Sequence, residues 1–190
     1  MKEFYTAAKP RIIYKIFELE KGLKLTGTSV TLQGRDIATL LSDCDSCILL
    51  AVTLGLEVDK LIRRTQVSDM GTALAIDTES NNYIEESCNK IQLGLEEEFL
   101  AKGLYLTDRF SPGYGDMPLS QVRDICKLLD TEKKIGIWVN ESDLMIPTKS
   151  ITAVIGISNK PQPKRISGCS NCKLYGICEY KKAGIKCQIN

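Results

Sequence analysis

Apolar residues recur along this chain with two different periods, which predict a mixture of helices and strands. Ser46–Thr53 is a continuous apolar run, typical of a strand that is buried on both faces. Glu79–Lys102 carries apolar side chains at spacings of three or four, which predicts a long helix. Because helices and strands do not alternate strictly, we expect an α+β fold, a single domain with a mixed or antiparallel twisted sheet flanked by helices.

Shorter segments complete this predicted fold. Gly22 and Gly103 are expected to end helices, and Ser68-Asp69 is expected to cap one. Further helices are predicted at Phe4–Lys21, Gly34–Ser42, Leu56–Val67 and Leu119–Asp130, and further strands at Leu104–Leu106, Ile135–Val139 and Ile151–Ile157. Leu23–Leu32 is expected to form a strand or an extended hairpin arm.

The composition changes after Ser158. Residues 159–166 contain two prolines and three basic residues, which is typical of a linker. We therefore expect one folded domain over residues 1–158, and a linker with a cysteine-rich tail over residues 159–190.

Charge and composition exclude several functions. The net charge of +1 creates no field that would attract nucleic acid or a membrane. No secretion signal is evident, and the longest apolar run, Ile48–Leu56, is too short to cross a bilayer, so a cytoplasmic protein is expected. The chain has no histidine, the usual general base and the commonest metal ligand. Its chemistry must use carboxylates, tyrosines, lysines, thiolates or a bound cofactor.

Four of the eight cysteines lie close together near the end of the chain. Cys169 and Cys172 have the spacing of two thiolates that share a metal, but the gaps to Cys178 and Cys187 match no standard site. An iron–sulfur cluster, a structural zinc ion, and free thiols or disulfides remain open.

The other four cysteines lie within residues 1–158, the expected folded domain. Cys44 and Cys47 are either two ordinary buried thiols or a redox pair, and Cys88 and Cys126 fall on apolar helix faces that belong in a core.

The segment Arg109–Asp116 carries most of the candidate chemistry. It combines a guanidinium, a hydroxyl, a Pro-Gly turn, a phenol ring and a carboxylate. Arg109 could grip a carboxylate in a fork, and Tyr114 could offer its ring to a cation. The segment is therefore either a binding loop for a small zwitterion or an ordinary surface turn. Lys149-Ser150 could likewise touch a ligand or form the turn before a strand.

Several motifs occur together in a characteristic order. They are Ala51–Gly55 followed by Asp59, Tyr83-Ile84-Glu85, Arg109–Asp116 with Pro118-Leu119, Ile135-Gly136-Ile137, and Pro147–Ala153. In this order they resemble the activation domain of cobalamin (vitamin B12)-dependent methionine synthase, in its short free-standing form. The resemblance covers roughly Gly34–Ser158.

The resemblance implies a reaction and its participants. Domains of this family bind S-adenosylmethionine and support the reductive methylation of inactive cob(II)alamin, with an electron from a low-potential donor. The histidine of the Asp-x-His-x-x-Gly cobalamin motif is missing here. The corrinoid would therefore be carried by a partner, a methionine synthase or related corrinoid methyltransferase.

The resemblance also implies roles for individual residues. Arg109 would hold the methionyl carboxylate, and Glu85, or its neighbour Glu86, would contact the cationic side of the ligand. Tyr114 would lie near the sulfonium or the corrin face and is the catalytic candidate. The ligand-binding set implied is Glu85, Arg109, Ser111, Pro112, Gly113, Tyr114 and Gly115.

This chain also departs from the family pattern. An acidic ligand contact near the family's N-terminus has no counterpart in Met1–Lys21, and the long enzyme lacks the cysteine tail. Two other functions therefore stay open: a non-catalytic S-adenosylmethionine-sensing docking module, and an iron–sulfur electron-transfer protein for a corrinoid enzyme.

Overall fold

The computed structural model describes residues 2–162, so the tail cysteines Cys169, Cys172, Cys178 and Cys187 lie outside the described residues. The described elements are α1 (Lys2–Ala7), β1 (Arg11–Glu20), β2 (Lys24–Leu25), α2 (Arg35–Leu40), β3 (Ser46–Thr53), α3 (Leu56–Ser68), α4 (Met70–Leu100), β4 (Tyr105–Leu106), α5 (Gln121–Leu129), α6 (Thr131–Ile135), β5 (Trp138–Val139), β6 (Met145–Ile146) and β7 (Ser150–Ser158).

The centre of the fold is a five-stranded sheet in the order β2-β1-β3-β7-β4. Its strand pairings are antiparallel throughout. The central strand β3 pairs with β1 from Arg11↔Thr53 to Glu18↔Ser46, and with β7 from Ser46↔Ile157 to Thr53↔Ser150. The predicted α+β class is confirmed, and of the two sheet types expected the antiparallel one is found.

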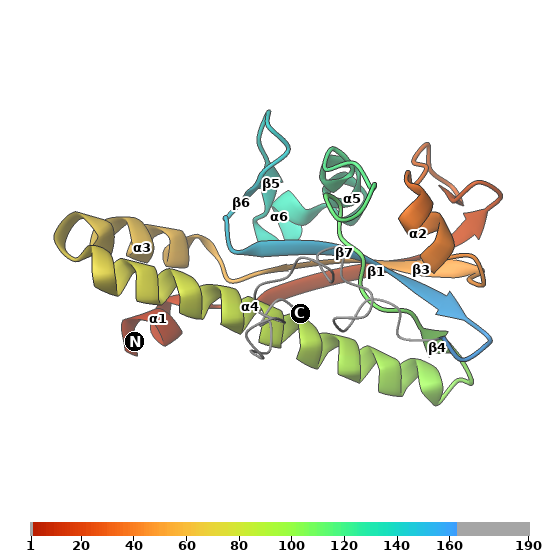
Figure 1. Cartoon of the computed structure of the whole chain (residues 1–190), viewed down its shortest axis with the longest axis horizontal. Helices are drawn as coiled ribbons and strands as arrows, with labels where there is room; N and C mark the ends of the chain where they lie inside the picture. Colours follow the sequence, from red (N-terminus) through yellow and green to blue (C-terminus); the bar gives the residue numbers. More distant parts are fainter. Residues whose placement is uncertain (1, 163–190) are drawn as a thin grey trace, which may run out of the picture.

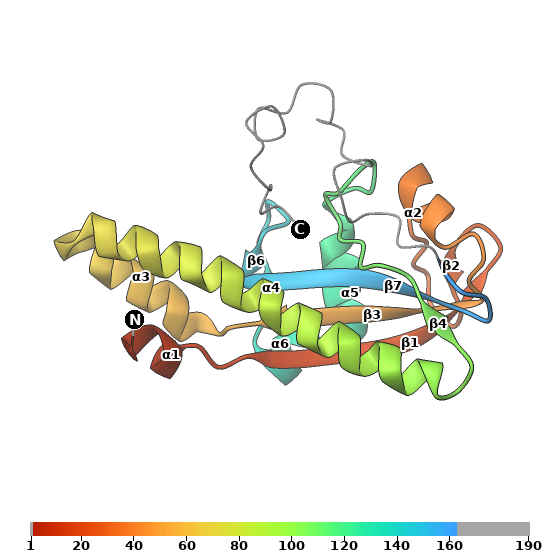
Figure 2. The ribbon, with the colours of Figure 1, turned by 60° about the horizontal axis from the view of Figure 1, so that its bottom comes forward.

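Helices cover the two faces of this sheet (Figures 1 and 2). Side chains alternate between the faces of a strand, so β3 contributes to both layers. Ile48, Leu50 and Val52 pack in the layer of α3 and α4, and Leu49 and Ala51 pack in the layer of α2, α5 and α6. Each fully buried Leu or Ile contributes about 1.5–3 kcal/mol, so both layers hold the long helix α4 and the short helices firmly against the sheet.

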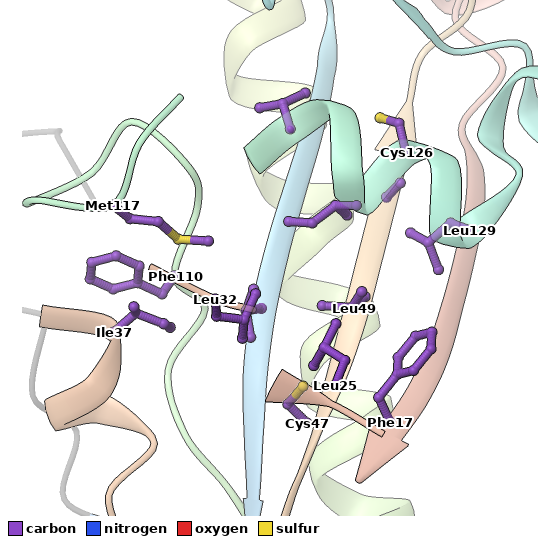
Figure 3. Packing of buried hydrophobic residues seen from close by; sticks show 14 of the residues in the cluster. Phe17, Leu25, Leu32, Ile37, Cys47, Leu49, Phe110, Met117, Cys126 and Leu129 are labelled. Carbon is purple, nitrogen blue, oxygen red and sulfur yellow. The ribbon is translucent and has the colours of Figure 1, made fainter. Parts of the chain in front are cut away.

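The second layer is built from segments far apart in the sequence. Figure 3 shows Phe17 of β1, Leu25 of β2, Leu49 of β3 and Leu129 of α5 in this cluster. Phe110 and Met117 join it, and they flank the segment Ser111–Asp116. The ends of that segment are therefore anchored in the core.

The predicted helix at Phe4–Lys21 is wrong. The helix α1 ends at Ala7, and β1 begins directly after Pro10. Ile12, Ile13 and Ile16 satisfy a helical spacing, but β-branched residues also favour a strand, and the ladder to β3 decides between the two. The partners in this ladder lie 28 to 42 positions apart in the sequence, a distance that local periodicity does not register.

Three other predictions need adjustment. Of the predicted strand or hairpin arm Leu23–Leu32, only Lys24–Leu25 is a strand, and Lys24 forms an isolated bridge with Thr31. Only Trp138–Val139 of the predicted strand Ile135–Val139 is a strand, because Thr131 begins a helical turn that ends at Ile135. The long helix begins at Met70 rather than at Glu79, and Asp69 caps it as expected by accepting the backbone N–H of Thr72 at 3.0 Å.

Among the described residues, no disulfide joins Cys44, Cys47, Cys88 or Cys126. Cys88 and Cys126 are buried, as predicted. Burial raises the pKa of Cys47 to about 12 and that of Cys88 to about 11, so both are protonated at neutral pH. Within residues 2–162, none of the helices has an apolar stretch long enough to span a bilayer.

Candidate functional site

Arg109 follows the edge strand β4. Leu106 pairs with Ile157 of β7, and Phe110 exchanges both backbone hydrogen bonds with Val154, at 2.9 and 2.7 Å. Four positions separate Leu106 from Phe110, whereas three separate Val154 from Ile157, so the β4 side carries one extra residue. An extra residue of this kind bends a strand and redirects its side chains, as in a β-bulge.

The guanidinium of Arg109 is held by three side chains of α4. Nη1 donates to Oε1 of Gln92 at 3.0 Å, and Nη2 donates to Oδ1 of Asn89 at 2.8 Å. Nη2 also lies 3.3 Å from Oε2 of Glu85. Residues 85, 89 and 92 are spaced by four and three, so they lie on one face of the helix. The family resemblance implies that Arg109 and Glu85 contact the same ligand, but it does not single out Asn89 or Gln92.

Glu85 and Glu86 have different surroundings. Glu85 faces Arg109, whereas Glu86 forms an ion pair with Lys90 at 2.8 Å. The side chain of Arg109 is 18% exposed and that of Glu85 is 48% exposed. The pair therefore lies at the surface with its cation partly covered, where an external anion can reach it.

The loop after Phe110 is compact. Gly113 donates to the carbonyl of Met117 at 3.0 Å, Tyr114 donates to Ser111 at 3.1 Å, and Met117 donates to Tyr114 at 3.0 Å. Gly113 and Gly115 have φ values of 90° and 55°, which glycine adopts without strain. Pro112 is buried, while the Tyr114 ring is 57% exposed. The loop is therefore internally ordered and presents its aromatic ring to solvent.

The last residue of this segment has a structural role. Asp116 accepts the backbone N–H groups of Arg35 and Asp36, at 2.8 and 3.0 Å. It thereby caps α2, whose own N-cap residue is Gly34 and has no side chain to do so. These hydrogen bonds lower the pKa of Asp116. Asp116 thus ties the glycine loop to α2.

Lys149 is also held by α4. Its Nζ lies 2.7 Å from Oδ1 of Asp77 and donates to Asn81 at 2.8 Å, and its side chain is 11% exposed. Lys149 therefore anchors the start of β7 to α4, which favours the structural interpretation of Lys149-Ser150.

The structure thus brings Glu85 into contact with Arg109, and Ser111–Gly115 begins two residues after Arg109 in the chain. Among residues 2–162, no group of three or more His, Cys, Asp or Glu side chains is arranged to hold a metal ion. The predicted metal ligands Cys169, Cys172, Cys178 and Cys187 lie outside the described residues.

The fold is that of an α+β domain with a five-stranded antiparallel sheet. A solved structure described as the crystal structure of the MetH reactivation domain bound to AdoHcy matches it with a TM-score of 0.64. The two chains are 17% identical, and the match covers 96% of this chain and 68% of the other.

Residues 84–169 match the family described as vitamin B12 dependent methionine synthase, activation domain. Over these residues the chain is similar to that family, and the resemblance seen in the sequence is confirmed. No match was found among curated proteins. The matched residues include Glu85, Asn89, Gln92, Arg109 and the glycine loop.

Proposed function

We propose that this protein binds S-adenosylmethionine at Arg109 and the glycine loop, and supports the reductive methylation of cobalamin on a partner protein. The observation that carries the proposal is the contact between Arg109 and Glu85, inside a fold shared with a MetH reactivation domain. Ser111–Gly115 begins two residues after Arg109 in the chain. The partner would be a cobalamin-dependent methionine synthase or a related corrinoid methyltransferase.

The two charges match the two charges of an amino acid. A bound carboxylate would replace Glu85 on the fork of Arg109, and the released Glu85 would accept the ligand's ammonium group. Since one ion pair is exchanged for two, no charge is left unpaired. This exchange favours a ligand that carries a complete amino acid group.

The loop would hold the rest of the ligand. Backbone groups of Ser111–Gly115 lie on a turn whose two glycines leave room for a close approach. The exposed ring of Tyr114 would lie near the sulfonium, which a π-face attracts. We assign Tyr114 the role of orienting the methyl group toward the corrinoid.

The chemistry itself belongs to the two small molecules. When the partner presents it, cobalamin supplies the cobalt centre that takes one electron and then the methyl group. A low-potential one-electron donor supplies that electron, and S-adenosylhomocysteine leaves once the sulfonium has lost its methyl. This chain contributes binding, orientation and the exclusion of water.

Calorimetry tests the binding step. We expect S-adenosylmethionine to bind the wild type and Arg109→Ala to lose about 2–4 kcal/mol of binding free energy, because the charge-assisted fork is removed. Arg63→Ala on α3 is a matched control that removes an exposed arginine elsewhere. Equal affinities for the wild type and Arg109→Ala would contradict the site.

Anaerobic reconstitution tests the transfer step. A cob(II)alamin-loaded partner, a reductant and methyl-labelled S-adenosylmethionine should place label on cobalt only when this protein is present. Binding without label transfer would instead indicate the sensing module. A redox-active cluster without nucleoside binding would indicate the electron carrier.

A further inference from the structure

We propose that Asn89 and Gln92 are positioning residues that aim the guanidinium of Arg109 while leaving its charge available to an incoming carboxylate. The inference rests on the proposed function, which assigns Arg109 to a carboxylate, but it concerns residues to which that function gives no role. Their contacts with Arg109 are 2.8 and 3.0 Å long.

The two amide oxygens hold the guanidinium from one side. Asn89 takes a hydrogen of Nη2 and Gln92 takes a hydrogen of Nη1, so both ends of the fork are anchored to the same helix face. Two anchors on consecutive turns prevent the planar group from rotating about its long side chain. An arginine that is already oriented loses less conformational freedom when it binds a ligand.

The orientation of the Gln92 amide follows from its second partner. Its Nε2 donates to Oε1 of Glu96 at 2.8 Å, one turn further along α4. A carboxylate accepts hydrogen bonds and does not donate them, so the nitrogen must face Glu96 and the oxygen must face Arg109. Glu96 therefore sets the direction in which Gln92 holds the guanidinium.

Both anchoring side chains, Asn89 and Gln92, are uncharged. Among the described residues that contact the guanidinium, only Glu85 carries a charge, and its 3.3 Å contact is the longest of the three. Amide oxygens accept hydrogen bonds without cancelling the positive charge. The anchors thus stay in place while Glu85, which is 48% exposed, exchanges for the ligand's carboxylate.

The test compares two ligands on matched variants. S-adenosylhomocysteine carries the amino acid carboxylate and 5′-methylthioadenosine lacks it. Asn89→Asp keeps an acceptor beside Nη2 but adds a negative charge, and Gln92→Leu removes the acceptor beside Nη1. We expect each to raise the Kd of S-adenosylhomocysteine about tenfold and to leave the Kd of 5′-methylthioadenosine unchanged. Asn82→Asp, which adds the same charge at an exposed position of α4, is the control.

A second measurement does not depend on ligand affinity. In ¹⁵N NMR spectra of the free protein, hindered rotation should resolve the Arg109 guanidinium N–H signals, and Gln92→Leu should average them. Urea unfolding identifies any variant that does not fold. If these variants lost equal affinity for both ligands, or lost affinity for neither, the role of Asn89 and Gln92 would be overturned. A wild type that binds no S-adenosylhomocysteine would overturn the proposed function itself.

Discussion

The carboxylate of Asp59 accepts both the backbone N–H and the hydroxyl of Thr148, each at 2.8 Å, across 89 positions of sequence. Asp59 lies in the first turn of α3 and is 4% exposed, and Thr148 precedes β7. The pair fastens α3 to the segment that leads into β7, the strand with which the edge strand β4 pairs.

Removing this carboxylate should destabilise the fold. We expect Asp59→Ala to lower the free energy of unfolding by about 2–3 kcal/mol, because two donors lose their partner in a largely buried place. Asp59→Asn keeps one acceptor oxygen and should therefore lower the free energy of unfolding by less than Asp59→Ala. Urea unfolding measures both, with the exposed Glu97→Ala as control. A loss no larger than that of the control would contradict this role.

The cap formed by Asp116 should make stability depend on pH. Hydrogen bonds from Asp36 and Arg35 lower the pKa of Asp116 in the folded state. A lowered pKa means that the stabilisation is complete above the ordinary value of about 3.9 and is lost as the pH falls through the folded value. Asp116→Asn should therefore unfold at lower urea concentration than the wild type at neutral pH. The difference between the unfolding midpoints of the wild type and Asp116→Asn should narrow below pH about 4.

Asp69 serves as the comparison for this pH dependence. Its pKa is also lowered, first by its hydrogen bond with the Thr72 side chain, and it caps α4. Asp69→Asn removes this titration as well, so its stability relative to the wild type should also fall as the pH rises through about 4. A stability difference between Asp116→Asn and the wild type that does not change with pH in the same direction would argue against the role of Asp116 as a cap supplied from another segment.

Two glycines should respond in opposite ways to alanine. Gly94 lies within α4, and a Cβ added there meets no atom within 4 Å, so Gly94→Ala should raise the free energy of unfolding by about 0.5–1 kcal/mol. Gly115 has a φ of 55°, and an added Cβ would collide with the carboxylate of Asp36. Gly115→Ala should therefore destabilise the loop and weaken binding of S-adenosylmethionine. Denaturant unfolding and calorimetry measure the two effects, and a destabilising Gly94→Ala would contradict the first.

The cysteine tail should be tested by metal analysis. We propose that Cys169, Cys172, Cys178 and Cys187, in the segment 159–190 beyond the domain of residues 1–158, bind an iron–sulfur cluster or a zinc ion. Protein purified without oxygen should contain iron and sulfide, or zinc, and Cys172→Ser should lose it. Cys88→Ser, which changes a buried thiol of the folded domain, should retain the bound metal. Metal content that is absent from the wild type, or unchanged in Cys172→Ser, would argue against the site.

Much of the fold could be predicted from local sequence. The strand Ser46–Thr53 was predicted with its observed bounds, since eight consecutive residues that avoid charge can only be buried. The cap at Asp69 and the helix at α2 were also correct. The segment Phe4–Lys21 was not, because its isoleucines fit both periods and only the pairing with β3 distinguishes them.

For the candidate site, the sequence by itself determined the candidates: Arg109 and the glycine loop from residue type and spacing, and Glu85 or Glu86 from the resemblance to the family. Tertiary structure decided how they are used. Packing of β4 against β7 brings Arg109 to the face of α4 where Glu85, Asn89 and Gln92 lie, and Glu86 faces Lys90 instead. Tertiary structure also places Asp116 at the start of α2, where it accepts a backbone N–H, and it brings Lys149 into an ion pair with Asp77. Hydrogen bonds and ion pairs act over about 3 Å, so they depend on which surfaces the folded chain brings together, a property that no local pattern contains.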